Sequence, residues 1–226
     1  MYIFVILSLI ITVAAQIHVH AAYSRYSKVR NERGITGAEA ARQLLLDHGI
    51  TNVGIEQIPG KLTDYYDPTR NVICLSEGVY DQDSVAAVGI AMHEAGHAVQ
   101  YAQNYAPAKL RNAIVKSTNI SSTVSYLLVV AGILLGGGSG RVGYSLITLG
   151  IYFFLAVIFF QLVTLPVEFN ASGRAVRSLR DSTMLNSDEQ KGVRKVLSAA
   201  ALTYVAAVAV SLLQLLRLLA IRGRRR

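Results

Sequence analysis

Long apolar stretches dominate the pattern of hydrophobic and polar positions along this chain. Four of them stand out, at residues 2–15, 120–135, 142–165 and 196–216. A helix needs about 20 predominantly apolar residues to cross the hydrocarbon core of a bilayer. The third and fourth stretches are long enough alone, whereas the first and second need help from flanking residues. The pattern therefore predicts an α-helical, multi-pass membrane protein.

Between the first and second stretches, over residues 23–113, the pattern is typical of a small α+β domain. Residues 36–46 have apolar side chains at helical spacing, and Gly49 follows at a position where helices commonly end. One strand with alternating apolar residues is expected at 53–58, and a second apolar strand at 71–76. The segment is long enough to form a small core of its own.

Composition agrees with the membrane assignment. Hydrophobic residues make up 52% of the chain and charged residues 16%, and the mean hydropathy of +0.39 is too high for an ordinary soluble domain. We attribute the net charge of +8 to contact with anionic lipid. Nucleic acid is not expected as a partner, because no basic stretch is interleaved with aromatic residues as in a recognisable binding module. The single cysteine, Cys74, excludes an intrachain disulfide, and its apolar neighbours indicate a buried structural thiol.

The distribution of cations around the first stretch predicts its orientation. No lysine or arginine precedes it, whereas Arg25, Lys28, Arg30 and Arg33 follow it closely. This bias favours an uncleaved anchor with its N-terminus outside over a cleaved secretory signal. Residues 23–118 would then lie in the cytoplasm, and the third stretch would return the chain to that side. A fourth crossing would place the arginine-rich tail outside, against the usual bias, so the last stretch either crosses or packs along the interface.

One pentapeptide carries a specific chemical signal, His93-Glu94-Ala95-Gly96-His97. On a helix, side chains four positions apart lie one above the other, so the two histidines can offer two imidazole nitrogens to one zinc ion. The glutamate belongs to the same turn and can take a proton from a metal-activated water. The helix can begin at Asp83 or Ser84, and small residues around the histidines leave room for an ion and a substrate backbone. The pattern predicts metal-assisted peptide hydrolysis.

A catalytic zinc site normally has a third protein ligand, and the sequence offers one distant candidate. The position six residues past the second histidine is Gln103, so the extended motif with a nearby third histidine is absent. Downstream, Glu168 follows an apolar stretch and Pro166, and it precedes apolar residues at helical spacing. An isolated carboxylate at such an edge is costly without a partner. Glu168 is therefore either a zinc ligand or a first-turn residue that complements the helix dipole.

Further segments with a recognisable pattern are spread over the chain. They are residues 62–68, 75–76, 79–80, 93–100 and 166–169. Together they resemble the YugP-type neutral zinc metallopeptidases of bacterial membranes, which are distantly similar to the HtpX and CAAX prenyl protease group. The resemblance extends from about Arg33 to the last apolar stretch. It implies one zinc ion bound by His93, His97 and Glu168, with Glu94 as the general base.

Three positions depart from the pattern expected of these relatives. Tyr65 stands where a histidine is expected, and Asn170 and Ser172 stand where aspartates are expected. The last two changes are expected to weaken hydrogen bonding around the ligands without altering the ligands themselves. Tyr65, Tyr66 and Arg174 are candidates for stabilising the oxyanion. By analogy with zincins, the strand at 71–76 could pair with an extended substrate, or it could merely cover the helix.

The resulting prediction is a membrane-bound zinc endopeptidase with a small zincin-like (gluzincin) domain. It would cleave peptide or protein substrates near the cytoplasmic face of the bacterial plasma membrane. A site-2-type intramembrane protease is an alternative, although its third ligand would be an aspartate in a later apolar stretch, and none is present there. A non-proteolytic scaffold or chaperone that keeps zinc for structure is another. The expected divisions are an anchor (1–22), the zincin-like domain (23–113), a transmembrane hairpin (114–166), a cytoplasmic helix with the third ligand (167–195) and a membrane helix with a basic tail (196–226).

Overall fold

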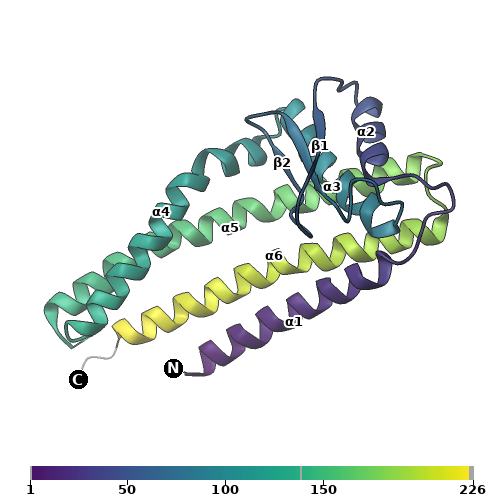
Figure 1. Ribbon diagram of the computed structural model, residues 1–226. Helices are drawn as coiled ribbons and strands as arrows, with labels where there is room; N and C mark the ends of the chain where they lie inside the picture. Colours follow the sequence, from purple (N-terminus) through teal and green to yellow (C-terminus); the bar gives the residue numbers. More distant parts are fainter. Residues whose placement is uncertain (1, 138, 224–226) are drawn as a thin grey trace. The chain divides into compact units, whose positions relative to one another are not determined.

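The computed structural model describes residues 2–137 and 139–223, and Figure 1 shows the order of its elements. The helices are α1 (Tyr2–Tyr26), α2 (Gly37–Asp47), α3 (Val85–Ala102), α4 (Ala106–Leu134), α5 (Arg141–Asp181) and α6 (Ser187–Arg222). The strands are β1 (Gly54–Ile58), β2 (Tyr65–Asp67) and β3 (Val72–Ser76). The described chain is thus mostly helical with a small sheet, as the pattern predicted.

Within the described chain, α1, α4, α5 and α6 are long and apolar enough to cross a membrane. This confirms the prediction of apolar helices from the four hydrophobic stretches, but the helices are longer than those stretches. Helix α4 begins near residue 106 rather than 120, and α5 continues through Pro166 into its polar second half. A proline inside a helix removes one backbone hydrogen bond. Packing of the next turn opposes that cost, because Val167 and Ala171 are fully buried.

Two compact units make up the chain, and each is described by itself. The helical unit contains Met1–Gln16, Leu110–Leu165 and Thr203–Arg226. The mixed unit contains Ile17–Lys109 and Pro166–Leu202. Helices α1, α4, α5 and α6 contribute residues to both units, whereas α2, α3 and the strands belong to the mixed unit alone.

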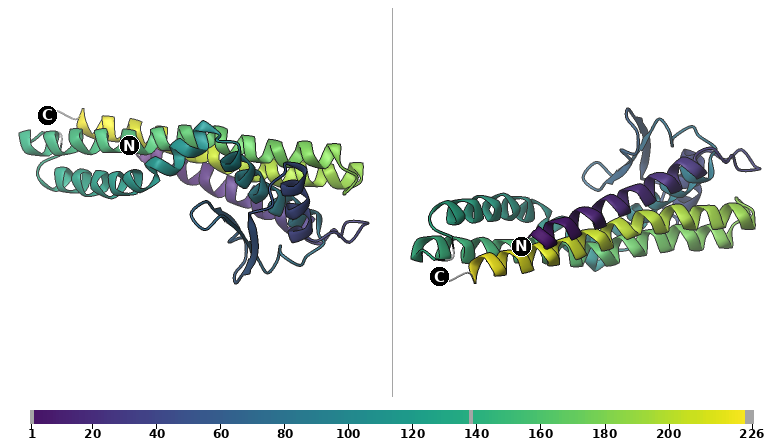
Figure 2. Two further views of the ribbon diagram at one scale, coloured as in Figure 1. Left: turned by 90° about the horizontal axis from the view of Figure 1, so that it is seen from above. Right: turned by 90° about the horizontal axis from the view of Figure 1, so that it is seen from below.

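In the helical unit, α4 and α5 lie side by side after the turn that joins them (Figure 2). The Ser125 hydroxyl of α4 donates a hydrogen bond to the Gly150 carbonyl of α5, at 2.8 Å. Near the turn, a Cβ atom on Gly132 would lie 2.9 Å from the carbonyl oxygen of Gly143, so glycine permits the close approach of the two backbones. Helix α6 joins them through a cluster in which Leu218 packs with Ile147 and neighbouring apolar residues.

In the mixed unit, the strands form one sheet with the order β1-β3-β2. β1 pairs with β3 in parallel, and β2 pairs with β3 antiparallel. The prediction of strands near 53–58 and 71–76 is confirmed, but β3 is the central strand, so the proposal that it pairs with substrate is wrong. Its second edge is occupied by β2, which is too short, at Tyr65–Asp67, to show a periodic pattern. Cys74 on β3 is fully buried, as predicted.

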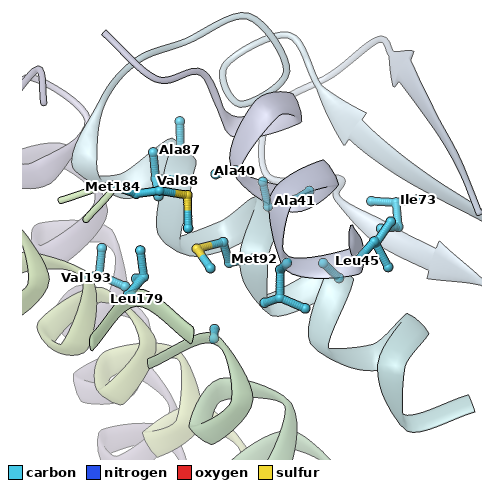
Figure 3. Close-up of a cluster of buried hydrophobic side chains, with 14 of the residues drawn as sticks. Ala40, Ala41, Leu45, Ile73, Ala87, Val88, Met92, Leu179, Met184 and Val193 are labelled. Carbon is cyan, nitrogen blue, oxygen red and sulfur yellow. The ribbon is translucent and has the colours of Figure 1, made fainter. Parts of the chain in front are cut away.

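Apolar side chains from α2, β3, α3, α5 and α6 form the core of the mixed unit (Figure 3). Met92 of α3 is fully buried there, as is Ile73 of β3. Leu179 and Val193, from α5 and α6, complete the cluster. In this core, α3 therefore packs against α2 and β3 and also against α5 and α6.

Helix α2 begins and ends as its sequence predicts. Thr36 is its N-cap, with its side chain accepting from the Glu39 amide while the Glu39 carboxylate accepts from the Thr36 amide. Such a reciprocal pair satisfies two amides that have no partner within the helix. Gly49 follows the helix with φ +69°, a conformation that glycine adopts without strain.

Candidate metal centre

Helix α3 carries the histidine motif, and its start is fixed by a side-chain cap. The Ser84 hydroxyl accepts a hydrogen bond from the Ala87 amide at 3.1 Å, which satisfies one of the free amides of the first turn. Of the two caps considered from sequence, Ser84 is therefore the one used. The carboxylate of Asp83 instead accepts hydrogen bonds from the guanidinium of Arg30, at 2.6–3.0 Å.

The two motif histidines lie next to each other on α3, as their spacing predicts. The ring centroids of His93 and His97 are 4.7 Å apart, and the rings meet edge to face. Both Nε2 atoms approach the same carboxylate oxygen, Oε2 of Glu168, at 3.2 Å from His93 and 3.5 Å from His97. Glu168 is only 2% exposed. The structure thus joins two residues of α3 with one residue of α5, 71 positions beyond the motif in sequence.

These distances fit a zinc ion. Ligand atoms that stand about 2.0 to 2.2 Å from one zinc ion in a tetrahedron are roughly 3.3 to 3.6 Å apart. The two distances to Glu168 are close to that range, and the ligand atoms of all three residues lie within 4.8 Å of one another. Two imidazoles and one carboxylate are also a ligand set that leaves the fourth position for water or substrate in catalytic zinc sites.

The hydrogen bonds of Gln100 fix the orientation of the His97 ring. The amide nitrogen of Gln100 donates to the Val167 carbonyl at 2.7 Å, so its amide oxygen must face the ring. That oxygen lies 3.0 Å from Nδ1 of His97 and can only accept, so Nδ1 carries the proton. Nε2 of His97 is then the unprotonated nitrogen, and it is the atom that faces Glu168. Such outer hydrogen bonds select the tautomer in metal sites.

The His93 ring has an equivalent partner in Ser172. Nδ1 of His93 and the Ser172 hydroxyl are 3.0 Å apart. A hydroxyl can accept from Nδ1, which leaves Nε2 of His93 free to bind a metal. Ser172 lies one turn after Glu168 on α5, so one short segment supplies both a candidate ligand and a partner for another ligand. The residue that replaces an expected aspartate therefore still contacts the site.

Arg174 reaches the site only through other side chains. Its Nε donates to Oδ1 of Asn170 at 2.8 Å, and the same oxygen accepts from the amide nitrogen of Gln100 at 3.0 Å. Its Nη1 donates to Oε1 of Gln103 at 2.7 Å. These bonds link the guanidinium to the His97 ring by way of Asn170 and Gln100. Sequence reasoning selected Arg174 for a different task and did not select Gln100.

The two tyrosines selected from sequence lie on β2. Tyr65 is 46% exposed and is paired with Cys74 across the sheet. The hydroxyl of Tyr66 donates to Oδ1 of Asn71 at 2.7 Å, and its ring packs against Tyr101 at the end of α3, with centroids 5.5 Å apart. The hydrogen bond of the Tyr66 hydroxyl thus leads to the turn before β3 rather than to the histidines.

Charges around His97 make the site favourable for a cation. Burial by itself lowers the pKa of His97, but the hydrogen bond to Glu168 and the negative charge of Glu94 outweigh burial, and the pKa is raised above its ordinary value. Glu94 is 9% exposed and belongs to the same turn of α3. A positive charge held between these carboxylates is therefore stabilised, whether it is a proton or a metal ion.

Gly96 explains how α5 comes close enough to supply Glu168. A Cβ atom at this position would lie 2.6 Å from the carbonyl oxygen of Ala171, closer than real Cβ contacts. Glycine within the motif therefore lets the backbones of α3 and α5 touch, less than one turn from Glu168. The sequence showed that small residues surround the histidines, but not that the backbone of α5 would pack against them.

Two cavities lie near the site without being lined by its three candidate ligands. The larger, of about 1180 Å³, is polar and includes Arg174 and Arg177 of α5 and Glu39 and Asp47 of α2. The smaller, of about 470 Å³, lies between α5 and α6 and includes Phe169, Val176 and Leu197. Ser172 lines this apolar cavity and also contacts His93, so the cavity begins one side chain away from the candidate metal position.

Comparison with known proteins agrees with the site. The family model described as "putative neutral zinc metallopeptidase" matches residues 1–223. The chain is 49% identical over 203 residues to the "putative membrane protease YugP" of Bacillus subtilis (strain 168), an alignment that covers 90% of this chain and 88% of the relative. No solved structure matches the chain. Because the match extends over nearly the whole length and includes the histidine motif and Glu168, the chain belongs to this neutral zinc metallopeptidase family, as the sequence resemblance predicted.

Proposed function

We propose that the protein is a membrane-bound, zinc-dependent endopeptidase whose zincin-like site acts at the cytoplasmic membrane face. The observation that carries this proposal is the convergence of His93, His97 and Glu168, whose ligand atoms lie within 4.8 Å of one another. Glu94 is placed in the same turn as the histidines, where a general base is needed. The family match and the relative named as a membrane protease agree with this function.

One zinc ion bound by these three residues would supply Lewis acidity, lowering the pKa of water and polarising a peptide carbonyl. The Glu94 carboxylate takes a proton from the attacking water as its oxygen bonds to the carbonyl carbon. Glu94 then delivers that proton to the amide nitrogen as the C–N bond breaks, which gives a carboxylic acid and an amine; transfer of the acid's proton to the amine leaves a carboxylate and an ammonium group. Gln100 and Ser172 keep both histidine rings in the orientation that this arrangement requires.

We assign substrate pairing to β2, because it is an edge strand of the sheet. Tyr66 of β2 packs against Tyr101 of α3, so this edge lies beside the helix that carries the motif. An extended peptide can add to such an edge through main-chain hydrogen bonds. The exposed Tyr65 would then be the tyrosine most accessible to substrate and the better candidate for contacting an oxyanion. Arg174 would support the site through Asn170 rather than contact the substrate.

The cytoplasmic location is proposed from charge. Lysines and arginines follow α1 closely, and others lie in the first half of α4, the second half of α5 and the first turns of α6. Such cations are retained in the cytoplasm of a bacterial cell. In contrast, the turn between α4 and α5 is glycine-rich and is followed by Arg141 alone. The mixed unit, with the metal centre, would therefore face the cytoplasm and meet substrates at the membrane surface.

The test uses full-length protein purified in detergent. Metal content is measured by elemental analysis, and cleavage is measured on casein and on a broad peptide library. We expect about one zinc per chain and peptide cleavage for the wild type. Glu94→Gln is expected to retain zinc and lose cleavage by at least about a hundredfold, because the ligands are intact and the base is absent.

Other outcomes separate the alternatives. A wild-type protein that binds zinc but cleaves no peptide in the library would favour a structural zinc scaffold. A Glu168→Gln variant with unchanged zinc affinity would remove Glu168 from the ligand set, and the proposal with it. Cleavage confined to substrates buried in the bilayer would favour a site-2-type protease instead.

A further inference from the structure

A further groove in the mixed unit lies between the end of α1 and the start of α6, which run side by side in Figures 1 and 2. Its volume is about 500 Å³. None of the candidate zinc ligands lines it. The residues that the argument uses are His18, Ala22 and Arg25 of α1 and Arg194, Lys195 and Ser198 of α6.

Short side chains leave space for the groove, and a close contact between α1 and α6 lies beside it. A Cβ atom on Gly192 would lie 2.8 Å from the Tyr26 ring, so glycine allows α1 and α6 to touch at this point. Further along, Ala22 and Ser198 line the space with short side chains. The helices therefore meet at Tyr26 and leave a hollow beside it, where longer side chains would otherwise fill the gap.

The charges that line this hollow are all positive. Arg25, Arg194 and Lys195 contribute three cations, and no carboxylate lines the groove in the part of the chain that the structure describes. The guanidinium of Arg25 lies 5.5 Å from the centroid of the Tyr26 ring, so it rests on an aromatic face rather than on an acid. The nearby Lys191, outside the groove, differs in having an acidic partner, because it forms an ion pair with Asp188 at 2.8 Å. An anion is therefore the ligand that complements the groove.

The position of the groove along the chain indicates which anion. It begins at His18, three residues after the end of the apolar stretch 2–15 of α1, and ends at Ser198, within the apolar stretch 196–216 of α6. Two helices thus change from charged to apolar at this groove. A ligand that matches both sides has an anionic group at one end and hydrocarbon at the other.

We propose that this groove binds the phosphate of an anionic phospholipid, with Arg25, Arg194 and Lys195 around the headgroup. Arginine forms paired hydrogen bonds with phosphate, and lysine supplies a compact charge. The acyl chains extend along the apolar stretches of the same two helices. The proposal does not depend on zinc or on peptide cleavage.

The test measures lipid binding to the full-length protein in a neutral detergent by native mass spectrometry. The probes are dioctanoyl phosphatidylglycerol, dioctanoyl phosphatidylcholine and inorganic phosphate. Phosphatidylglycerol is expected to saturate at about one molecule per chain and to bind more tightly than phosphatidylcholine. The double variant Arg194→Gln/Lys195→Gln is expected to lose about tenfold to thirtyfold in affinity for phosphatidylglycerol.

The controls keep the proposal falsifiable if the double variant folds poorly. Lys191→Gln removes one charge from the same helix outside the groove and should leave lipid affinity unchanged. The charge-preserving variant Arg194→Lys/Lys195→Arg should retain most of the binding. Equal affinity for phosphatidylcholine, unchanged binding by the double variant, or displacement of the lipid by equimolar inorganic phosphate would each overturn the proposal.

Discussion

Gln100 shows how a residue outside the motif determines the chemistry of the histidine within it. Its side chain is fully buried and makes hydrogen bonds to the His97 ring, the Val167 carbonyl and Asn170. The carbonyl fixes the direction of the amide, and the amide fixes which ring nitrogen carries the proton. Gln100 can fix the His97 ring only while its own amide is held by these partners. Since Val167 and Asn170 lie on either side of Glu168, the same hydrogen bonds connect α3 to the turn of α5 that carries Glu168.

Removing this amide should weaken metal binding. We expect Gln100→Leu, which keeps the approximate volume but no hydrogen bonds, to lower zinc affinity by about ten- to a hundredfold. The Nδ1 proton of His97 loses its acceptor, and the Val167 carbonyl loses its donor. Affinity is measured by competition with a chromophoric chelator. Gln103→Leu is the matched control, because Gln103 is exposed and contacts Arg174 instead. Similar zinc affinities for the two variants would contradict this role.

At single positions, the sequence predicted the histidine pair well because a spacing of four residues on a helix has only one geometric meaning. It left Glu168 open between two roles, since nothing in the local sequence shows which helix a distant carboxylate will meet. For the same reason, the sequence did not show that Gln100 and Ser172 are the hydrogen-bond partners of the two histidine rings. Asn170 and Ser172, which depart from the expected aspartates, both have hydrogen bonds in this network.

At the scale of elements, the site depends on the contact between α3 and α5. Gly96 and Ala171 touch through their backbones, and Glu168 lies three residues before that contact. The contact sets the distance from the carboxylate to both histidines. Burial of Ala175 and Leu179 on the same face of α5 continues the contact toward the core, as their helical spacing predicted.

A methyl group at the contact should separate the two helices. We expect Gly96→Ala to lower zinc affinity by more than about tenfold and to reduce the melting temperature, because its Cβ would lie 2.6 Å from the Ala171 carbonyl oxygen. Gly173→Ala is the control on α5, since the nearest atom to its added Cβ is the flexible Arg177 side chain at 3.6 Å. That variant should bind zinc normally and be slightly more stable, by about 0.5 to 1 kcal/mol. Chelator competition and thermal unfolding compare the pair, and equal behaviour would argue against the close contact.

The start of α3 offers a separate test that concerns stability alone. Ser84→Ala removes the cap of the motif helix and is expected to cost about 1 kcal/mol of folding stability. Ser178→Ala, in the last turn of α5, should cost little, because this half-buried hydroxyl caps no helix and makes only a long contact of 3.5 Å with Asp47. Denaturant titration of the two metal-free proteins measures the difference. A Ser84→Ala protein as stable as Ser178→Ala would show that the amides of the first turn find other partners.

Strands were harder to predict than helices in this chain. The alternation that indicates a strand needs at least four or five residues, and β2 has three, Tyr65–Asp67. Its place in the sheet comes from pairing with β3, a contact across a turn that ends at the left-handed residue Asn71. Because β2 was not predicted, the strand at 71–76 was considered as one that could pair with substrate, whereas both of its edges are occupied in the sheet.

At the scale of the whole molecule, helix length explains what hydropathy could not predict. Helix α5 has 41 residues, which corresponds to about 60 Å along its axis, twice the thickness of a hydrocarbon core. Hydropathy detects its apolar first half but not its continuation, because the second half is amphipathic and buried against protein. The division of α5 between two units at residues 165 and 166 follows this change in chemistry.

The path of α6 was left open by the charge pattern, and the packing of the helical unit favours a full crossing. Leu218, near the end of α6, packs with Ile147, near the start of α5. The guanidinium of Arg222 lies 5.9 Å from the centroid of the Tyr144 ring, close to the same end of α5. The end of α6 therefore lies beside the turn that joins α4 to α5. If that turn is outside, the end of α6 is outside as well, despite its arginines.

Cysteine labelling in intact cells tests this arrangement. In a Cys74→Ser background, Ser139→Cys in the turn and Gly223→Cys after α6 should both react with a membrane-impermeant maleimide added outside the cell. Ser187→Cys, at the exposed start of α6, should react only after the membrane is permeabilised. The reason is that α6 needs about 20 residues to cross, and its segment in the helical unit, from Thr203 onward, supplies that length. If Gly223→Cys and Ser139→Cys react from opposite sides, α6 does not cross, and its contact with α5 cannot exist in the membrane. If Ser187→Cys reacts in intact cells, the metal centre faces outward, and the substrates must be sought outside the cytoplasm.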